Sequence, residues 1–305
     1  MLVFLKKIIM PKNWLATLVF IANGFFTVYL FCFLMAVLNV QLDSTITILI
    51  GVGLYLFSIV IALTPLGEWL CRSIFTTKTI HISKHPQYER LNGLFMEVYK
   101  KALKESPRLS RKVKLFIHKD DSINACAMGK STIIINTGLL ALSDEEIKGV
   151  IAHEFAHLAN GDTLFSLAFC IGNFIFSAVL FAIKIIALFV NIIFSAVFDR
   201  DSLIMLVVLI ALDIIFGLWN IIGNFIIKLT GRKAEYDADH YAGKIGYANQ
   251  LKNALIKIEG EGIHFRMGLI EAINASHPDT CKRVERLEKN FPEQNKLTNV
   301  NPTAV

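Results

Sequence analysis

The chain has 305 residues, of which 54% are hydrophobic and only 18% are charged, and its mean hydropathy is +0.53. This composition is too apolar for an ordinary soluble protein of this length and predicts a membrane protein. The formal net charge of +6 could indicate a nucleic-acid partner, but neither an aromatic-basic stripe nor a glycine-rich phosphate loop accompanies it. We therefore assign the basic excess to membrane-flanking segments and expect no nucleic-acid partner.

The cysteines give no sign of a disulfide framework. They are odd in number and lack the paired spacing of thiolate metal sites. Their positions are Cys32, Cys71, Cys126, Cys170 and Cys281. We therefore expect the soluble part of the chain to lie in a reducing compartment.

Two apolar stretches within residues 1–67 predict a transmembrane hairpin. The first, Trp14–Val40, is longer than the apolar region of a signal peptide and lacks a clean cleavage site, so we expect it to be retained. The second, Thr45–Leu63, ends at the turn sequence Thr64–Gly67. Basic residues flank the outer ends of the hairpin. By the positive-inside rule, the N-terminus and the chain after Gly67 are then cytoplasmic.

Residues 68–162 have the pattern of a soluble α+β segment. Helical spacing of apolar residues predicts a helix over Pro86–Lys104, and β-rich runs predict strands at Lys112–Ile117 and Thr132–Asn136. Between these strands, the small residues of Ile123–Lys130 are compatible with an edge strand that another backbone can approach, or with a plain hairpin. We expect a small antiparallel sheet here.

A metal-binding pattern lies in Val150–His157, which contains the motif H-E-x-x-H. Residues four apart stand one helical turn above each other, so His153 and His157 can present imidazole nitrogens to one point that suits a zinc ion. Glu154 can reach a water molecule at that point. The capping box Ser143–Glu146 predicts the start of the helix. The alternative is an ordinary solvated helix face, which the apolar neighbours of the histidines disfavour.

Two further apolar runs, Leu164–Phe198 and Leu203–Ile227, predict a second transmembrane hairpin over residues 163–228. The number of crossings matters, because a third metal ligand after this hairpin must return to the membrane face of the two histidines. Two spans satisfy this condition and three do not. Asp213, inside the second run, is either a functional intramembrane carboxylate or a packing residue, and Lys184 is a possible partner.

Carboxylates cluster where the chain leaves this hairpin, in Arg232–His240. Glu235 and Asp239 are four apart and share a helix face, so one can bind the metal while the other receives an N–H from a ligating histidine. Alone, the segment is compatible with a charged solvated helix, but the H-E-x-x-H motif on the same membrane face favours a third ligand. The predicted segments are thus 1–67, 68–162, 163–228, a cytosolic helical part 229–290 and a disordered tail 291–305.

The sequence resembles the HtpX-type membrane metalloproteases, relatives of the CAAX prenyl endopeptidases, over nearly the whole chain. The matching segments are Asn124–Ala127, the H-E-x-x-H helix with Asn160–Asp162 after it, Arg232–Asp239, and Ser276–Pro278 with Arg283. The resemblance implies an α-helical membrane protein with an α+β zincin-like catalytic domain of the gluzincin type. It also implies four transmembrane helices in two hairpins, with the small sheet beside the H-E-x-x-H helix.

The resemblance assigns a role to each member of the metal-binding pattern. It implies one zinc ion per chain, held by His153, His157 and Glu235. Glu154 maps onto the catalytic base, which takes the proton of the attacking water. Asp239 maps onto the carboxylate that supports a ligand from behind.

The resemblance also implies a substrate-binding strand. Asn124, Ala125 and Cys126 match an edge strand that holds an extended peptide by main-chain pairing. Cys126 stands where the family often has phenylalanine, which alters the neighbouring substrate pocket. His277 and Arg283 are candidates for an oxyanion donor or a substrate contact.

The implied function is that of a zinc-dependent endopeptidase in a bacterial inner membrane. Its substrates would be misfolded or damaged membrane proteins, cleaved at the cytoplasmic face during quality control and stress. One rival is a CAAX-type prenyl endopeptidase, which needs a large intramembrane chamber that four spans are too few to enclose. The other is a non-catalytic membrane scaffold with a structural zinc, in which Glu154 would have no purpose.

Overall fold

The structure is a computed structural model. It describes residues 14–37, 40–75, 79–82, 88–164, 167–168, 171, 181, 184–186, 188–189, 192–193, 210, 213–214, 217–218, 221, 233–261 and 279–296. The chain divides into two compact units. The first comprises residues 1–64 and 168–227, and the second comprises residues 65–167 and 228–305.

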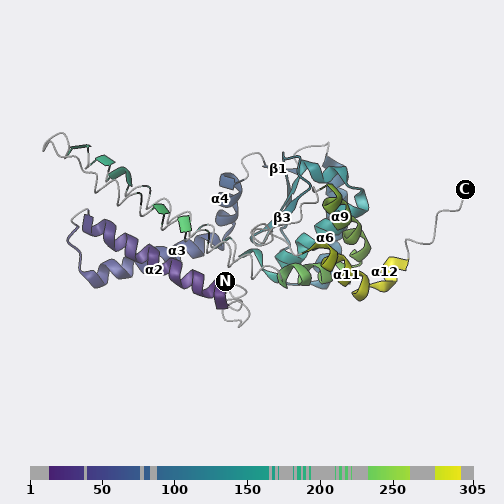
Figure 1. Cartoon of the computed structure of the whole chain (residues 1–305), viewed down its shortest axis with the longest axis horizontal. Helices are drawn as coiled ribbons and strands as arrows, with labels where there is room; N and C mark the ends of the chain where they lie inside the picture. The colour runs from purple at the N-terminus through teal and green to yellow at the C-terminus, as the bar shows by residue number, and fades with distance from the viewer. Residues whose placement is uncertain are drawn as a thin grey trace, which may run out of the picture. The chain divides into compact units, whose positions relative to one another are not determined.

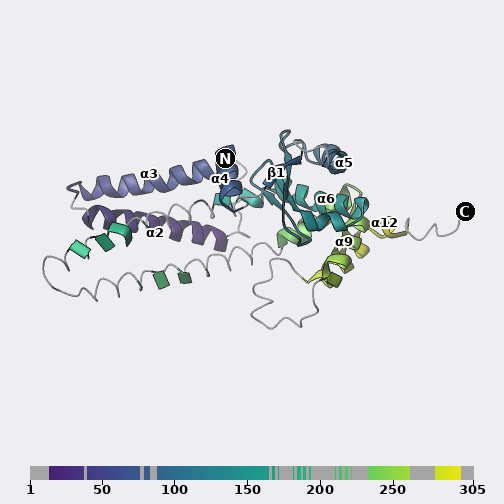
Figure 2. The ribbon, with the colours of Figure 1, turned by 90° about the horizontal axis from the view of Figure 1, so that it is seen from above.

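Two apolar helices, α2 (Trp14–Val37) and α3 (Ser44–Ala62), lie side by side in the first unit (Figure 2). The Asp43 carboxylate caps α3 by accepting hydrogen bonds from the first backbone N–H groups of the helix. Across the pair, the Tyr55 hydroxyl donates to the carbonyl oxygen of Phe20 over 2.7 Å. By length and composition, α3 is long and apolar enough to cross a membrane, and the stretch Thr17–Phe33 of α2 is apolar as well.

The second predicted hairpin, residues 163–228, lies mostly outside the described residues, so its two spans stay a prediction. The residues that join its two predicted spans, 199–202, also lie outside them. One detail is described: the Lys184 ammonium contacts the Asp213 carboxylate. Lys184 is therefore the partner of Asp213 that the sequence suggested.

Helix α4 (Pro65–Phe75) opens the second unit, where the sequence predicted only a turn at residues 64–67. Proline is suited to the first position of a helix, because that position needs no backbone N–H donor. Pro65 therefore starts a new helix, and the break after α3 is confined to Leu63 and Thr64.

The second unit contains a four-stranded sheet of the order β1-β2-β4-β3 (Figure 1). Its strands are β1 (Thr79–His81), β2 (Lys114–His118), β3 (Ala125–Met128) and β4 (Thr132–Asn136). The expected antiparallel sheet is wrong, because β2 and β4 are parallel while the other two pairs are antiparallel. The chain passes from β2 to the outer edge and reverses at Gly129 (φ 61°), so β4 returns beside β2 in the same direction.

Helices cover this sheet and complete the core. They are α5 (Glu89–Glu105), the short 3-10 helix η4 (Thr137–Ala141), α6 (Asp144–Asn160), a helix over 233–244, α9 (Ala248–Glu261) and α11 (Thr280–Asn290). Helix α6 contacts β3 and α5, and Figure 1 shows α9 beside it. Phe155 of α6 stacks on Phe95 and Tyr99 of α5, with ring centroids 5.4 and 5.1 Å apart. The motif helix thus lies inside the core of the unit.

A glycine allows α6 and α9 to approach each other closely. A Cβ atom at Gly149 would lie 2.4 Å from the backbone nitrogen of Leu251, a distance that real side chains do not tolerate. This contact, four residues before His153, fixes the distance between α6 and α9. It thereby helps to fix the position of His153 and His157.

The predicted disordered tail begins too early at residue 291. Residues Pro292–Lys296 form helix α12, and Phe291 packs against Gly243 and the ring of His240. The Gln294 side chain accepts a hydrogen bond from the Ala248 backbone and donates another to the carbonyl oxygen of Gly243. These contacts order a segment whose composition resembles a loop.

Candidate metal centre

Local capping sets both ends of the motif helix α6. The Ser143 hydroxyl accepts from the Glu146 backbone N–H, and the Glu146 carboxylate accepts from the Ser143 backbone N–H, as the sequence predicted. At the other end, Gly161 adopts a left-handed conformation (φ 67°), which terminates the helix. The two histidines lie on the last turns of a helix whose register is fixed at both ends.

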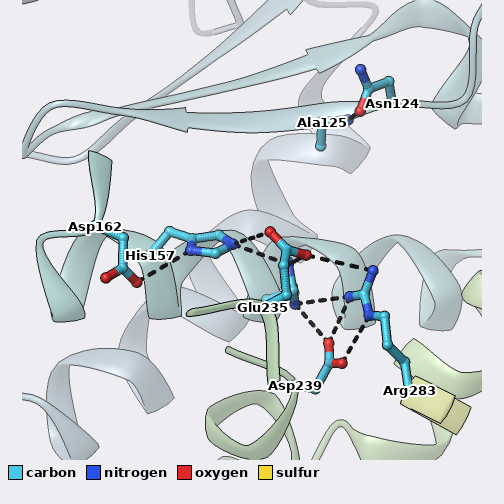
Figure 3. A network of polar contacts seen from close by, with 8 residues as sticks. Asn124, Ala125, His157, Asp162, Glu235, Asp239 and Arg283 are labelled. Carbon is cyan, nitrogen blue, oxygen red and sulfur yellow. Dashed lines mark hydrogen bonds and ion pairs between the residues drawn. The ribbon is translucent and has the colours of Figure 1, made fainter. Parts of the chain in front are cut away.

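Three side chains converge on one point, as Figure 3 shows. The Nε2 atoms of His153 and His157 are 3.1 Å apart, and each lies 3.4 Å from a carboxylate oxygen of Glu235. Glu235 comes from the helix 233–244, far along the chain from the motif helix. In the described part of the chain, this is the group of histidine, cysteine and acidic side chains placed to hold a metal ion.

The spacing of the three side chains is compatible with a zinc ion. Tetrahedral zinc at about 2.0 to 2.1 Å from nitrogen or oxygen places any two ligand atoms roughly 3.3 to 3.4 Å apart. The Nε2 atoms of the two histidines are 3.1 Å apart, and each lies 3.4 Å from a different carboxylate oxygen of Glu235, so the three groups are close enough to share one ion. Two imidazoles and one carboxylate are also a donor set typical of catalytic zinc, which keeps a fourth position open.

The Asp239 carboxylate contacts the Nδ1 side of the His153 ring, while Glu235 lies on the Nε2 side. The Nδ1 atom of His153 lies 2.9 Å from Asp239, so its N–H donates to the carboxylate and Nε2 is left for the metal. The Arg283 guanidinium donates to the same carboxylate through two nitrogens, over 2.8 and 2.6 Å, and approaches Glu235 at 3.5 Å. Asp239 and Arg283 are both buried.

Asp162 plays the same part for the second histidine, and the sequence reasoning did not single it out. Its carboxylate lies 3.4 Å from Nδ1 of His157 (Figure 3). The signal was present in the sequence, because a glycine C-cap turns the chain back toward the last helical turn. The Asp162 backbone N–H donates to the carbonyl oxygen of His157 and holds that turn.

The carboxylates make the site strongly attractive to a cation. Burial lowers the pKa of His157, but its contacts with Asp162 and Glu235 outweigh burial and raise the pKa to about 10. Burial likewise lowers the pKa of His153, and Asp239 and Glu235 outweigh it, so the pKa is raised. A metal ion that binds here displaces protons from both rings.

The outer strand β3 borders the site. Asn124 and Cys126 are exposed, and Figure 3 shows the Ala125 side chain pointing from β3 toward the metal-binding residues. The Asn124 carbonyl oxygen accepts a hydrogen bond from the Asn136 backbone N–H of β4. Because successive residues of a strand direct their backbone N–H and C=O groups to opposite sides, those of Ala125 and Ala127 face the free edge of β3. The structure therefore places the predicted edge strand, which also forms a hairpin with β4, along the site.

The remaining predicted site residues are placed as follows. Glu154 is buried next to His153 in α6. Arg283 is engaged by Asp239, an arrangement that suits a supporting role better than direct contact with substrate. His277 lies outside the described residues.

Comparison with known families matches residues 90–290 to a family described as "Peptidase family M48". The matched region contains all three converging ligands and Glu154. The chain belongs to peptidase family M48, and this membership makes it a metalloprotease.

Curated relatives place the chain among HtpX-type proteases within this family, which confirms the resemblance seen in the sequence. It is 28% identical over 270 residues to "Protease HtpX homolog" of Methylacidiphilum infernorum, an alignment covering 77% of this chain and 85% of the relative. It is 23% identical over 262 residues to the homolog of Bacillus subtilis, covering 77% and 84%. It is also 30% identical over 196 residues to "Protease HtpX" of Shewanella oneidensis, covering 56% and 66%.

Among solved structures, the chain is similar to the crystal structure of S. mikatae Ste24p. The TM-score is 0.48 and the sequence identity is 21%. The match covers 92% of this chain and 65% of that chain, so this chain spans somewhat less than two thirds of the length of Ste24p.

Proposed function

We propose that this protein is a membrane-bound zinc endopeptidase that cleaves unfolded or damaged membrane proteins at the cytoplasmic face. The observation that carries the proposal is the convergence of His153, His157 and Glu235, whose ligand atoms lie close enough together to share one metal ion. Family membership supplies the reaction class, peptide hydrolysis by a metalloprotease. The metal identity, the substrate and the membrane face belong to the proposal.

Glu154 is the residue that moves protons in this proposal. When bound, zinc supplies Lewis acidity and makes water a stronger nucleophile near neutral pH. The Glu154 carboxylate takes the proton of the attacking water and later gives it to the leaving amine, one group serving first as base and then as acid. Its burial beside His153 and His157 keeps it within the site and away from bulk water.

The free edge of β3 is the proposed substrate-binding element. An extended peptide adds as a further strand when its backbone pairs with exposed N–H and C=O groups. Ala125 and Ala127 turn those groups outward, and their small side chains let another backbone approach closely. Such pairing uses main-chain hydrogen bonds and does not depend on the side chains of the substrate. This independence suits an enzyme that cleaves unfolded chains of many kinds.

Three features support the membrane location and the cytoplasmic face. The composition is strongly apolar, and α3 has the length and hydropathy of a membrane span. Glu235 follows the second apolar region yet meets His153, which requires an even number of crossings between them. Basic residues flank the outer ends of the first hairpin, which favours a cytoplasmic site.

The test is cleavage of an unfolded protein by detergent-purified enzyme of known metal content. We expect activity to disappear with a chelator and to return with zinc. We expect Glu154→Gln to retain zinc and to lose cleavage by about 100-fold or more, because it removes a general base. Retained cleavage would overturn the role of Glu154. Zinc retention in a wild-type protein that never cleaves would favour a scaffold, and cleavage of prenylated peptides alone would favour a prenyl endopeptidase.

A further inference from the structure

Helix α4 exposes two large apolar side chains and buries a carboxylate. Leu66 and Trp69, which are three residues apart and share a face, are 52% and 53% exposed. The opposite face holds the carboxylate of Glu68, which is only 5% exposed, and the buried Cys71. A surface helix of a soluble domain turns its apolar side chains inward. The exposed face of α4 therefore favours contact with an apolar surface.

The polar inward face is satisfied by the turn between β3 and β4. The Glu68 carboxylate accepts hydrogen bonds from the Lys130 backbone N–H at 2.6 Å, the Ser131 hydroxyl at 2.7 Å and the Thr132 hydroxyl at 2.9 Å. Gly129 leaves room for this carboxylate, because a Cβ atom there would lie 2.3 Å from the Glu68 side chain. The buried charge is thus fully engaged by a turn that directly follows the substrate strand.

A second inward contact fixes the rotation of α4 about its axis. The Arg72 guanidinium lies over the Phe116 ring of β2, 4.2 Å from its centroid, and lies 3.4 Å from the Thr132 hydroxyl. Glu68 and Arg72, four residues apart, both point to the sheet. With this side anchored, Leu66 and Trp69 are held outward and cannot turn into the core.

Chain continuity identifies what covers this outward face. Helix α4 begins at Pro65, and only two residues separate it from the end of α3, the helix with the length and hydropathy of a membrane span. Leu66 and Trp69 lie in the first two turns of α4, within about 6 Å of its start along the helix axis at 1.5 Å per residue. Tryptophan is enriched at membrane interfaces, and amphipathic helices bind there by their apolar face.

We propose that the Leu66–Trp69 face of α4 lies in the interfacial region of the phospholipid bilayer. The proposal rests on the proposed function in taking α3 as a membrane span, and its consequence for substrates also takes β3 as the substrate-binding strand. Because Glu68 of the same helix holds the β3–β4 turn, α4 fixes the height of the substrate strand above the lipid surface. The substrate segments that reach β3 are then those that emerge from the bilayer close to its surface.

The experiment measures the depth of Trp69 by fluorescence in the full-length protein. The chain has three tryptophans, so Trp14→Phe with Trp219→Phe leaves Trp69 as the only one. This variant is reconstituted in phosphatidylcholine vesicles whose acyl chains carry bromine either near the headgroup or near the chain end. We expect loss of most of the Trp69 emission with bromine near the headgroup, and a smaller loss with the deeper bromine. A variant that keeps only Trp14, on apolar helix α2, confirms that the brominated lipids quench.

Each other outcome overturns the proposal. Emission unchanged by either lipid but quenched by acrylamide places Trp69 in water. Emission shielded from both lipid and acrylamide places it against protein, such as a second copy of the chain. Circular dichroism confirms that the variants fold, and the readout needs no peptidase activity. Quenching without cleavage would therefore reject the proposed function and leave the contact of α4 with lipid intact.

Discussion

The Asp239 carboxylate accepts two hydrogen bonds from the Arg283 guanidinium, at 2.8 and 2.6 Å, while it also receives the Nδ1–H of His153. The arginine comes from α11 and the aspartate from the helix 233–244. Burial raises the pKa of Asp239, but Arg283 and His153 outweigh burial and lower it. The carboxylate therefore stays ionised and fixes the orientation of the imidazole that is proposed to bind zinc.

Replacing Asp239 should weaken metal binding. Asp239→Ala removes the acceptor of the His153 Nδ1–H, so we expect zinc affinity to fall by about 10- to 100-fold, as for other such supporting groups. Competition with a fluorescent zinc chelator measures the change. Asp237→Ala is the matched control, because Asp237 is exposed on the same helix. Equal affinity of both variants would remove Asp239 from the metal site.

Replacing Arg283 should destabilise the protein before it affects chemistry. Arg283→Ala leaves Asp239 buried without its main partner, and breaking a buried ion pair in this way costs about 3–5 kcal/mol. We expect a clear fall in Tm in detergent. The control, Arg286→Ala on the same helix, removes only an exposed guanidinium that lies 3.8 Å from the Tyr236 ring centroid and should cost at most about 1 kcal/mol. An unchanged Tm with a lower kcat would instead favour the oxyanion role that the sequence suggested.

Features with local causes were accessible from the sequence. The start of α6 follows from a capping box of two residues three apart, and β4 follows from an uninterrupted β-branched run. The pairing of His153 with His157 needs only the helical repeat. Predicting Glu235 as a ligand required more information, because its approach to the two histidines depends on the apolar region between residues 163 and 228. It could be named only by combining its spacing to Asp239 with the count of membrane crossings and with the resemblance to HtpX-type proteases.

Features that depend on distant partners were missed or wrong. The sheet was expected to be antiparallel because the local sequence carries no information on strand order. It does not reveal that β4 pairs with β2 and that β3 lies at the edge. Helix α4 was missed because its buried residue is a glutamate, which a pattern of apolar residues cannot reveal, and its hydrogen-bond partners lie more than sixty positions away. Asp162 was missed although its partner His157 is close in the sequence, because the turn at the left-handed Gly161 was not foreseen.

Gly149 should not tolerate even one extra carbon. Gly149→Ala drives a Cβ atom into the backbone of Leu251, so α6 and α9 must separate, and overpacking of this kind costs roughly 1–3 kcal/mol. Because α6 carries the metal-binding histidines, we expect a lower Tm together with weaker zinc retention. Gly93→Ala is the control, since Gly93 is exposed in helix α5 with nothing near its Cβ position, and it should be neutral or stabilising. The same Tm for both variants would contradict close packing at Gly149.

The capping box gives the fold a specific sensitivity to acid. Burial raises the pKa of Glu146, but Lys257, at 2.7 Å, and the backbone and hydroxyl of Ser143 outweigh it and lower the pKa. A carboxylate with a lowered pKa in the folded state contributes stability above its unfolded pKa, near 4.3, and loses it as the pH falls below that value. We therefore expect Glu146→Gln to lower Tm at pH 7 and to make Tm less dependent on pH in the acid range. Glu259→Gln, an exposed site on α9, should leave the profile unchanged.

The contact between Lys184 and Asp213 should hold the second apolar region together. Both residues lie in runs that are otherwise apolar, where an unpaired charge is costly and a paired one less so. We expect Lys184→Met and Asp213→Leu each to lower Tm in detergent, and the exchange of the two charges, Lys184→Asp with Asp213→Lys, to recover most of the loss. Recovery requires direct contact, because two independent sites would give additive losses. If the double exchange lowers Tm by as much as the two single losses added together, the pair does not stabilise the protein through its ionic contact.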